Sequence, residues 1–198
     1  MSELQNLASR VHACTDCSLS EGRTQAVPGE GPEQADLMFI GEGPGYHEDQ
    51  QGRPFVGPAG QFLEQLLASI GMSRNQVFIA NMIKCRPPNN RDPLPSEVAA
   101  CSKYLDRQIQ LVEPKVIVTL GRHSLVKFLP GATISKAHGK AVRKESFILY
   151  PIYHPAAALH QQSLRSVIEE EFKAIPSLLQ EQVVLPQAEE PAQQPSLL

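Results

Sequence analysis

The chain has 198 residues and a formal net charge of −3, a length that suits one α/β domain with a sizeable core. It contains no apolar run of the ~18 residues that a membrane span needs, and its first ten residues lack the apolar core of a signal peptide. We therefore expect a cytoplasmic protein that acts as a monomer. Because the overall charge does not indicate nucleic-acid binding, contact with a polyanion would depend on local basic clusters, such as those within 84–91 and 136–144.

Short apolar runs alternate with segments of helical periodicity along most of the chain. The apolar runs predict four strands, over 36–40, 77–80, 115–120 and 147–153. The periodic segments predict helices over 2–13, 58–70, 95–111, 121–129 and 164–179. This alternation predicts a parallel sheet with helices on both faces, in one domain over 1–180. Residues 133–146 are polar and basic and predict a loop or a hairpin. We expect 181–198, which is rich in Pro, Gln and Glu, to be a disordered tail.

Residues 41–45 read Gly-Glu-Gly-Pro-Gly and directly follow the first predicted strand. Three glycines and a proline allow main-chain N–H groups to point at a ligand without hindrance from a Cβ. The glycine spacing resembles a dinucleotide-binding fingerprint, but that fingerprint requires a helix to start within it. Pro44 and the polar residues up to Gly52 predict a long loop instead. A bare turn that binds nothing is the remaining alternative.

The four cysteines form one close pair, Cys14 and Cys17, and two more distant members, Cys85 and Cys101. Four thiolates can bind zinc or hold an iron–sulfur cluster, and disulfides are not expected in a cytoplasmic protein. A redox-active C-x-x-C pair normally opens a helix just after a strand, but this pair precedes the first predicted strand. Because zinc sites more often use two close pairs, the spacing favours a cluster slightly. Four unrelated buried cysteines are the other alternative.

Polar side chains follow three of the predicted strands. The loops after the first, second and fourth strands contain Glu48 and Phe55, then Asn81, then His154. Because the carboxyl ends of parallel strands meet at one edge of a sheet, we expect these side chains to converge. An amide can read the hydrogen-bonding edge of a nucleobase, and an aromatic ring can stack on the base. The residues thus predict a site for a flat, amide-like ligand, although a lone histidine is often purely structural.

Several motifs together resemble the family 4 uracil-DNA glycosylases, the iron–sulfur members of their superfamily. They are GEGPG at 41–45, GRPFVGPAGQ at 52–61, NMIKCRPP at 81–88, HPAAAL at 154–159, and the four cysteines. The resemblance covers roughly residues 10–180, and the motifs agree in order and spacing. It implies a three-layer α/β/α sandwich around a four-stranded parallel sheet. It also implies a structural [4Fe–4S] cluster held by the four cysteines.

The resemblance further implies a DNA repair reaction. A member of this family flips uracil out of DNA and hydrolyses its N-glycosidic bond, which leaves free uracil and an abasic site for base excision repair. By this likeness, Phe55 would stack on the flipped ring and Asn81 would hydrogen-bond its O4 and N3. The main-chain amides of Glu42 and Gly43, together with His154, would stabilise the uracil anion as it leaves.

The attacking water and the DNA contacts are implied by the same likeness. Glu48 and Asn90 would position the water, and a carboxylate there would also stabilise positive charge on the sugar. The implied DNA contacts are three basic residues and one apolar wedge for the minor groove. These residues are Lys84, Arg86, Arg91 and Leu159.

Two other functions stay open from the residues alone. One is a non-catalytic iron–sulfur or zinc protein that binds nucleic acid, and the other is an electron-transfer protein. The end of the chain, with Gln194, Leu197 and Leu198, is similar to the short peptides that bind the bacterial sliding clamp. A flexible linker with an apolar end suits that role, and an end without a partner is the alternative.

Overall fold

The structure is a computed structural model that describes residues 1–181. Its sheet contains the strands β1 (Leu37–Gly41), β2 (Phe78–Asn81), β3 (Val116–Leu120), β4 (Val142–Arg143) and β5 (Ile148–Ile152), in the order β2-β1-β3-β5-β4. Four strands are parallel, as predicted, and β4 adds an antiparallel pair at the edge through two residues that face β5. The α/β class is therefore confirmed, but the expected strand count of four is wrong by one.

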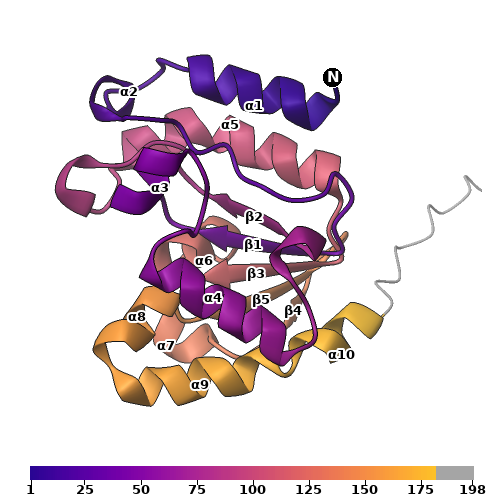
Figure 1. Cartoon of the computed structure of the whole chain (residues 1–198). Coiled ribbons are helices and arrows are strands. Elements are labelled where there is room, and N and C mark those ends of the chain that lie inside the picture. The colour runs from indigo at the N-terminus through magenta and orange to yellow at the C-terminus, as the bar shows by residue number, and fades with distance from the viewer. Residues whose placement is uncertain (182–198) are drawn as a thin grey trace, which may run out of the picture.

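Helices precede, separate and follow these strands (Figure 1). Over the described residues they are α1 (Glu3–Ala13), α2 (Leu19–Gly22), α3 (Tyr46–Gln51), α4 (Pro58–Ser69), α5 (Pro95–Val112), α6 (Arg122–Phe128), α7 (Ile134–Ala137), α8 (Pro155–His160), α9 (Gln162–Phe172) and α10 (Ile175–Gln180). The expected tail over 181–198, apart from Glu181, and the clamp-binding peptide with Gln194, Leu197 and Leu198 lie outside the described residues.

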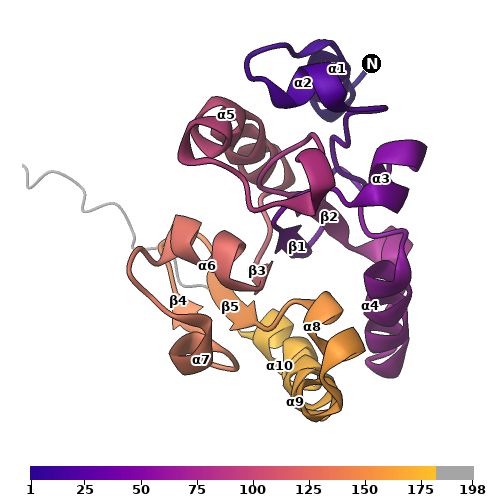
Figure 2. The same cartoon turned by 90° about the vertical axis from the view of Figure 1, so that its left-hand side faces the viewer.

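The parallel strands are buried on both faces, which explains why they read as continuous apolar runs. Phe39 and Val118 face one side of the sheet, where α4, α8, α9 and α10 cover them. Their neighbours Met38 and Ile117 face the other side, where α5 and α6 pack. Figure 2 shows the sheet between these two groups of helices. The three-layer arrangement places the carboxyl ends of β1, β2, β3 and β5 at one edge of the sheet.

A further helix, α1, lies on the outer side of α5 (Figure 1). Its Leu7 and Val11 pack on Tyr104 of α5 and on Ile83 from the segment after β2. Ser2 caps its N-terminus by accepting a hydrogen bond from the N–H of Gln5, whose side chain accepts one from the N–H of Ser2. The first helix is thus attached to the body through a small apolar contact that also includes the cysteines.

Several segments differ from the prediction. Residues 133–146, expected as a loop or a hairpin, contain α7 and β4. The loop expected up to Gly52 contains α3, and Glu48 at its third position accepts a hydrogen bond from the N–H of Gly45, which satisfies the start of the helix. The HPAAAL segment forms α8 with Pro155 at its first position, where proline is well suited. The single helix expected over 164–179 is broken near Lys173, between α9 and α10.

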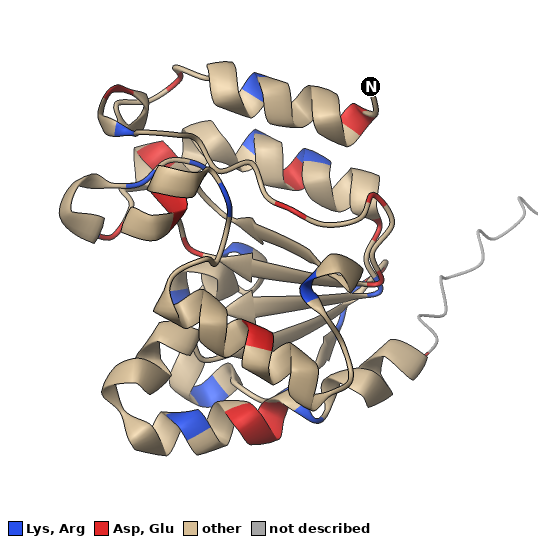
Figure 3. Ribbon diagram, in the orientation of Figure 1, with Lys and Arg blue, Asp and Glu red and all other residues tan. Residues whose placement is uncertain are grey.

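Charged residues of both signs are mixed along the described chain (Figure 3). This agrees with the small net charge of the sequence. None of the helices within residues 1–181 is both long and apolar enough to cross a membrane. Local groups of side chains, rather than the overall field, therefore determine what this protein can bind.

Candidate functional site

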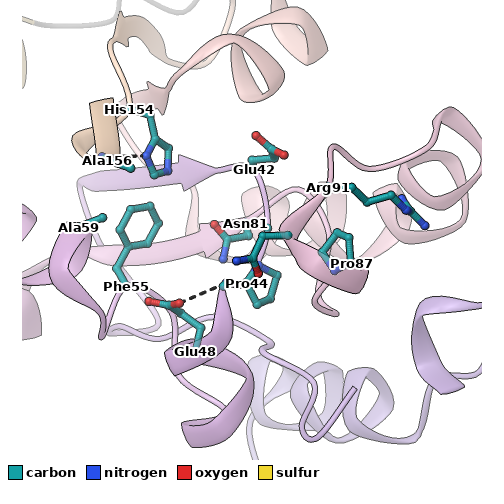
Figure 4. A pocket seen from close by; sticks show the side chains of 13 residues that line it. Glu42, Pro44, Glu48, Phe55, Ala59, Asn81, Pro87, Arg91, His154 and Ala156 are labelled. Carbon is teal, nitrogen blue, oxygen red and sulfur yellow. Dashed lines mark hydrogen bonds between the residues drawn. The ribbon is translucent and has the colours of Figure 1, made fainter. Parts of the chain in front are cut away.

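A cavity of about 430 Å³ opens at the carboxyl edge of the sheet. Its lining comes from the segment after β1, the end of β2, the proline-rich loop over 84–95 and the start of α8 (Figure 4). The lining residues are Glu42, Gly43, Pro44, Gly45, Glu48, Phe55, Ala59, Asn81, Pro87, Asn90, Arg91, His154 and Ala156. Eight residues singled out from the sequence are among them, and segments more than 60 residues apart in the chain meet here because the parallel strands end together.

Asn81 forms the floor of the cavity at the last position of β2. The residue is buried, and its Oδ1 atom has no hydrogen-bond partner among the described residues. An unpaired buried carbonyl costs free energy, because it has lost water without gaining a donor. The cavity therefore presents an acceptor that a ligand N–H can satisfy.

Gly41 allows Asn81 and Phe55 to approach each other. A Cβ at Gly41 would lie 2.4 Å from Oδ1 of Asn81 and 2.8 Å from the ring of Phe55. Both contacts are shorter than van der Waals contact, and the ring and the amide are fixed by burial. The glycine at the end of β1 thus lets an aromatic face and an amide share one wall.

We expect the Gly41→Ala variant to lose at least about tenfold in ligand affinity or activity, because the added methyl pushes the amide and the ring apart. Gly22→Ala is the control, since a Cβ there meets nothing within 4 Å. Activity and thermal unfolding of both variants would be measured side by side. Wild-type activity in Gly41→Ala would contradict the close packing described here.

Phe55 has a left-handed backbone conformation, with φ of 52°. This conformation is unfavourable for a residue with a Cβ and requires support from its surroundings. Arg74 supplies it by donating from Nη1 to the carbonyl oxygen of Phe55 at 2.8 Å, and Gly60 leaves room for the same carbonyl. The ring of Phe55 then lies 5.6 Å from that of His154, centroid to centroid, with the planes inclined by 27°.

His154 caps the start of α8 with its side chain. Its Nδ1 accepts a hydrogen bond from the N–H of Ala156 at 3.1 Å, so in the neutral ring the proton is on Nε2. Burial lowers the pKa of His154 to about 4, although the nearby Glu48 carboxylate acts in the opposite direction. The ring therefore provides a neutral Nε2–H donor at ordinary pH.

Glu48 is held in place by three main-chain donors. Its Oε1 accepts from the N–H groups of Val56 at 2.9 Å and Gly57 at 3.0 Å, and its Oε2 accepts from Gly45 at 3.1 Å. Charge-assisted bonds of this kind fix a carboxylate firmly. Figure 4 shows it below Phe55, at the edge of the cavity. The structure thus supports an oriented negative charge at this position.

Asn90 and the two arginines of the proline-rich loop differ in their hydrogen-bond and ion-pair partners. Asn90 is exposed at the cavity rim, and its Oδ1 accepts from Nε of Arg86 at 2.7 Å. Arg91 lines the cavity, but its guanidinium is paired with the buried carboxylate of Glu97 through two hydrogen bonds of 2.6 and 2.8 Å. Leu159 is 45% exposed on α8 and free to contact a partner. Asn90 and Arg91 thus line the cavity, whereas Arg86 and Leu159 are not among its lining residues.

Lys84 differs from the other residues that were expected to contact DNA, because its side chain is buried. Its Nζ donates to the carbonyl oxygen of Asn81 at 2.8 Å and to Oε1 of Gln108 at 2.6 Å. Burial lowers the pKa of this ammonium to about 8. The ammonium therefore fixes the end of β2 from inside and cannot reach a phosphate, so the expectation of a DNA contact at Lys84 is wrong.

Three charged or ionisable residues near Glu42 were not predicted from the sequence, namely Asp92, Arg122 and His123. Nε2 of His123, on α6, lies 3.5 Å from Oε2 of Glu42 and 3.4 Å from Oδ1 of Asp92, and Arg122 also pairs with Asp92. Burial raises the pKa of Glu42, and His123 partly offsets this. A signal was available, because Arg122 and His123 directly follow β3, whose carboxyl end is at the same edge.

The four cysteines lie around a second, smaller cavity beneath α1 and α5. Cys85 and Cys101 are buried, whereas Cys14 and Cys17 are partly exposed. Nη1 of Arg23 donates to Sγ of Cys85 at 3.1 Å, and the N–H of Lys84 donates to Sγ of Cys101 at 3.3 Å. Donors that point at sulfur suit thiolates bound to a metal group.

The distances between the four sulfur atoms can be compared with those around a tetrahedral zinc ion. Tetrahedral zinc with bonds of about 2.3 Å brings its four sulfurs to about 3.8 Å from one another. Within residues 1–181, no three of these sulfurs lie within 4.8 Å of one another. The four thiols thus lie farther apart than a single zinc ion requires, and a set of four thiol donors also suits an iron–sulfur cluster.

Comparison with known proteins agrees with this geometry. The family model "Uracil DNA glycosylase superfamily" matches residues 28–176. A "Type-4 uracil-DNA glycosylase" of Sulfurisphaera tokodaii is 49% identical over 90% of this chain and 86% of its own length. One of the same description from Archaeoglobus fulgidus is 44% identical over 90% of this chain and 94% of its own.

A "Type-5 uracil-DNA glycosylase" of Pyrobaculum aerophilum is less similar, at 32% identity over 66% of this chain and 65% of its own length. The type-4 relatives thus match both more of the chain and more closely. The chain belongs to the uracil DNA glycosylase superfamily and, within it, to the type-4 uracil-DNA glycosylases.

Proposed function

We propose that this protein excises uracil from DNA by hydrolysing the N-glycosidic bond, as the first step of base excision repair. The observation that carries the proposal is the unpaired Oδ1 of Asn81, which lies beside the ring of Phe55 in a cavity open to one side. Such a cavity accepts a flat base that has been flipped out of its strand. The names of the type-4 relatives support the same reaction.

Asn81 selects the base. Its Oδ1 accepts from N3–H of uracil, and its Nδ2 donates to O4. Cytosine lacks an N3–H and carries an amino group at position 4, so both contacts would be lost. Phe55 stacks on the ring, and Gly41 keeps the stacking face next to the amide.

The leaving uracil carries negative charge, which accumulates at O2 in the transition state. Nε2–H of His154 donates to that oxygen, because Nδ1 is already occupied by Ala156. The main-chain N–H groups of Glu42 and Gly43 have no acceptor among the described residues. They provide two further donors at the same end of β1, and none of the three must reorganise during the reaction.

The sugar becomes positively charged as the bond breaks, and water attacks it. The carboxylate of Glu48, fixed by Gly45, Val56 and Gly57, stabilises this charge and orients the water. Asn90 contributes its amide NH₂ group, since its Oδ1 is held by Arg86. Water is thus bound opposite the leaving base, between the carboxylate of Glu48 on α3 and the amide of Asn90.

The cysteines hold a [4Fe–4S] cluster in this proposal, through Cys14, Cys17, Cys85 and Cys101. A bound cluster supplies a structural cross-link between the N-terminal segment, the proline-rich loop and α5. Arg86 and Arg91 belong to the loop that begins at Cys85. The cross-link therefore stabilises the loop that contacts DNA. Leu159 of α8 contributes a second DNA contact, as an apolar wedge in the minor groove. The clamp contact through Gln194, Leu197 and Leu198 stays a prediction from the sequence.

The test is an excision assay with a labelled oligonucleotide that contains one uracil. Alkali cleaves the abasic product, and free uracil is measured in parallel. We expect cleavage by the wild type and a loss of about 10²–10³-fold in His154→Ala, because one preorganised donor is removed. An oligonucleotide with thymine at the same position is the control. A fully metallated protein that binds this DNA but releases no base would instead support the non-catalytic reading.

The rate should depend on pH through His154 in a characteristic way. Its pKa falls from an ordinary 6.5 to about 4 in the folded protein. The unfolded chain thus binds the extra proton first, so the stabilisation from a neutral His154 is complete above about pH 6.5 and is lost as the pH falls towards 4. We expect single-turnover rates to stay level from pH 8 to below 6.

Single-turnover rates between pH 8 and pH 4 would check this expectation, with circular dichroism at each pH to follow folding. The His154→Gln variant is the control for titration, because its amide keeps a donor but cannot be protonated. A decline in the wild-type rate centred near pH 6.5 would show that the imidazole is not buried in the working state.

A further inference from the structure

Tyr46 is an exposed aromatic residue at the rim of the base cavity. It is the first residue of α3 and follows Gly45, which lines the cavity. The residue is 53% exposed, whereas most aromatic rings of the described chain are buried in the core. Leaving a large apolar ring in water forgoes the free energy of its burial, so an exposed ring beside a binding site suggests a contact with the ligand.

Arg86 connects Tyr46 to the cavity. Its guanidinium carbon lies 5.2 Å from the centroid of the Tyr46 ring, and its Nε donates to Oδ1 of Asn90 at 2.7 Å. The ring of His47 lies edge-on to Tyr46, at 5.5 Å between centroids. Ring and guanidinium are therefore oriented by neighbours on both sides, which reduces the entropy lost when a ligand binds.

The charge of Arg86 is not neutralised within residues 1–181. Other arginines near the rim have carboxylate partners there, since Arg91 pairs with Glu97 and Arg122 pairs with Asp92. Arg86 has no such partner among the described ion pairs, and only its Nε is occupied by Asn90. Its terminal NH groups are available to donate hydrogen bonds to the oxygens of a phosphate. The planar guanidinium is well suited to such paired hydrogen bonds.

We propose that Tyr46 stacks on the nucleobase next to the flipped uracil on the same strand, with Arg86 bound to the adjoining phosphate. This inference rests on the proposed uracil excision. Tyr46 stands one residue beyond Gly45 of the cavity wall, and in this proposal the next base of the strand lies against it. An aromatic ring with a neighbouring cation is the arrangement that binds single-stranded nucleic acid without sequence preference. A neighbour that is unpaired is free to stack, so the platform favours uracil in single-stranded or locally open DNA.

A double-mutant cycle between the protein and the DNA tests this contact. The substrates are three single-stranded oligonucleotides with one uracil, in which both neighbours are adenines, or the 5′ or the 3′ neighbour is a tetrahydrofuran sugar without a base. The enzymes are the wild type, Tyr46→Ala and Tyr46→Phe, all in the metallated form. Val126→Ala is the matched control, since Val126 is 43% exposed on α6 and does not line the base cavity.

On the all-adenine substrate we expect Tyr46→Ala to lose about tenfold in kcat/KM, mostly through KM, because one stacking contact is removed. Tyr46→Phe and Val126→Ala should match the wild type. Removing the neighbouring base that stacks on Tyr46, whether 5′ or 3′, should lower kcat/KM of the wild type by a similar factor. The same removal should not lower kcat/KM of Tyr46→Ala any further. Equal losses in both enzymes on removal of the 5′ base and also on removal of the 3′ base would overturn the proposal, and so would a Tyr46→Phe variant as weak as Tyr46→Ala.

Failure of the proposed reaction would be distinguishable from failure of this contact. If the wild type releases no base from any substrate, excision is refuted, and fluorescence anisotropy with the same oligonucleotides then decides on stacking. A tenfold weaker affinity of Tyr46→Ala, lost when the neighbouring base is absent, supports the platform. Equal affinities of the wild type and Tyr46→Ala overturn it.

Discussion

Replacing Asn81 by alanine should lower kcat/KM for uracil excision by about 10³-fold, which is the largest effect expected for a single residue in the base cavity. The variant removes the acceptor for N3–H and the donor for O4 together, and the base then leaves two polar groups unpaired in a buried site. The measurement is steady-state excision from a single-stranded oligonucleotide with one uracil.

Asn81→Asp is the informative companion variant. It keeps the size of the side chain but offers only acceptors, so the contact to O4 becomes repulsive. We expect a loss close to that of Asn81→Ala, with unchanged thermal unfolding as evidence that the fold is intact. If Asn81→Asp excised uracil at the wild-type rate, Asn81 would not read the base, and the unpaired Oδ1 would need another explanation.

The second large effect concerns the cysteines. Cys101 is buried on α5, and Cys101→Ser should lower the free energy of unfolding by at least about 3 kcal/mol, since a lost metal site also loses the cross-link that it provides. The wild type should absorb near 400 nm, as expected for a cluster of this class, and the variant should not. Limited proteolysis should then cut the variant within 14–23, between α1 and the sheet.

Ser102→Ala is the matched control for this variant. Ser102 is the next residue on α5, is partly exposed, and donates only to the carbonyl oxygen of Ala99 within its own helix. It should keep the absorbance, the unfolding temperature and the resistance to protease. A Cys101→Ser protein with all three properties of the wild type would show that Cys101 does not bind the metal group.

Much of the fold follows from the sequence because the strands are buried on both sides. A run such as 37–40 has no polar residue to accommodate, and so its apolar pattern directly indicates a central parallel strand. The short elements carried too little signal. α8 has six residues after His154, and β4 has two, so pairing with the rest of the sheet rather than local pattern determines them.

The site was predictable where a residue lies at the end of a strand or just beyond it, as Asn81 and His154 do. Lys84 shows the limit of such reasoning. Arg86 and two prolines follow it closely in the sequence, which is typical of a DNA-binding loop, but Oε1 of Gln108 on α5 accepts a hydrogen bond from its ammonium inside the protein. Gln108 also donates to the carbonyl oxygen of Pro28, a contact between distant segments that no local pattern reveals.

The position of the two sites along the chain has a consequence for synthesis. Proteins emerge from the ribosome with the N-terminus first. A chain that has been made up to Val112 already contains α1, β1, β2, α5 and every cysteine. It lacks β3, which lies between β1 and β5, and it lacks His154. The thiols are therefore present well before the base cavity is complete, and a product truncated before β5 retains all four cysteines but lacks His154.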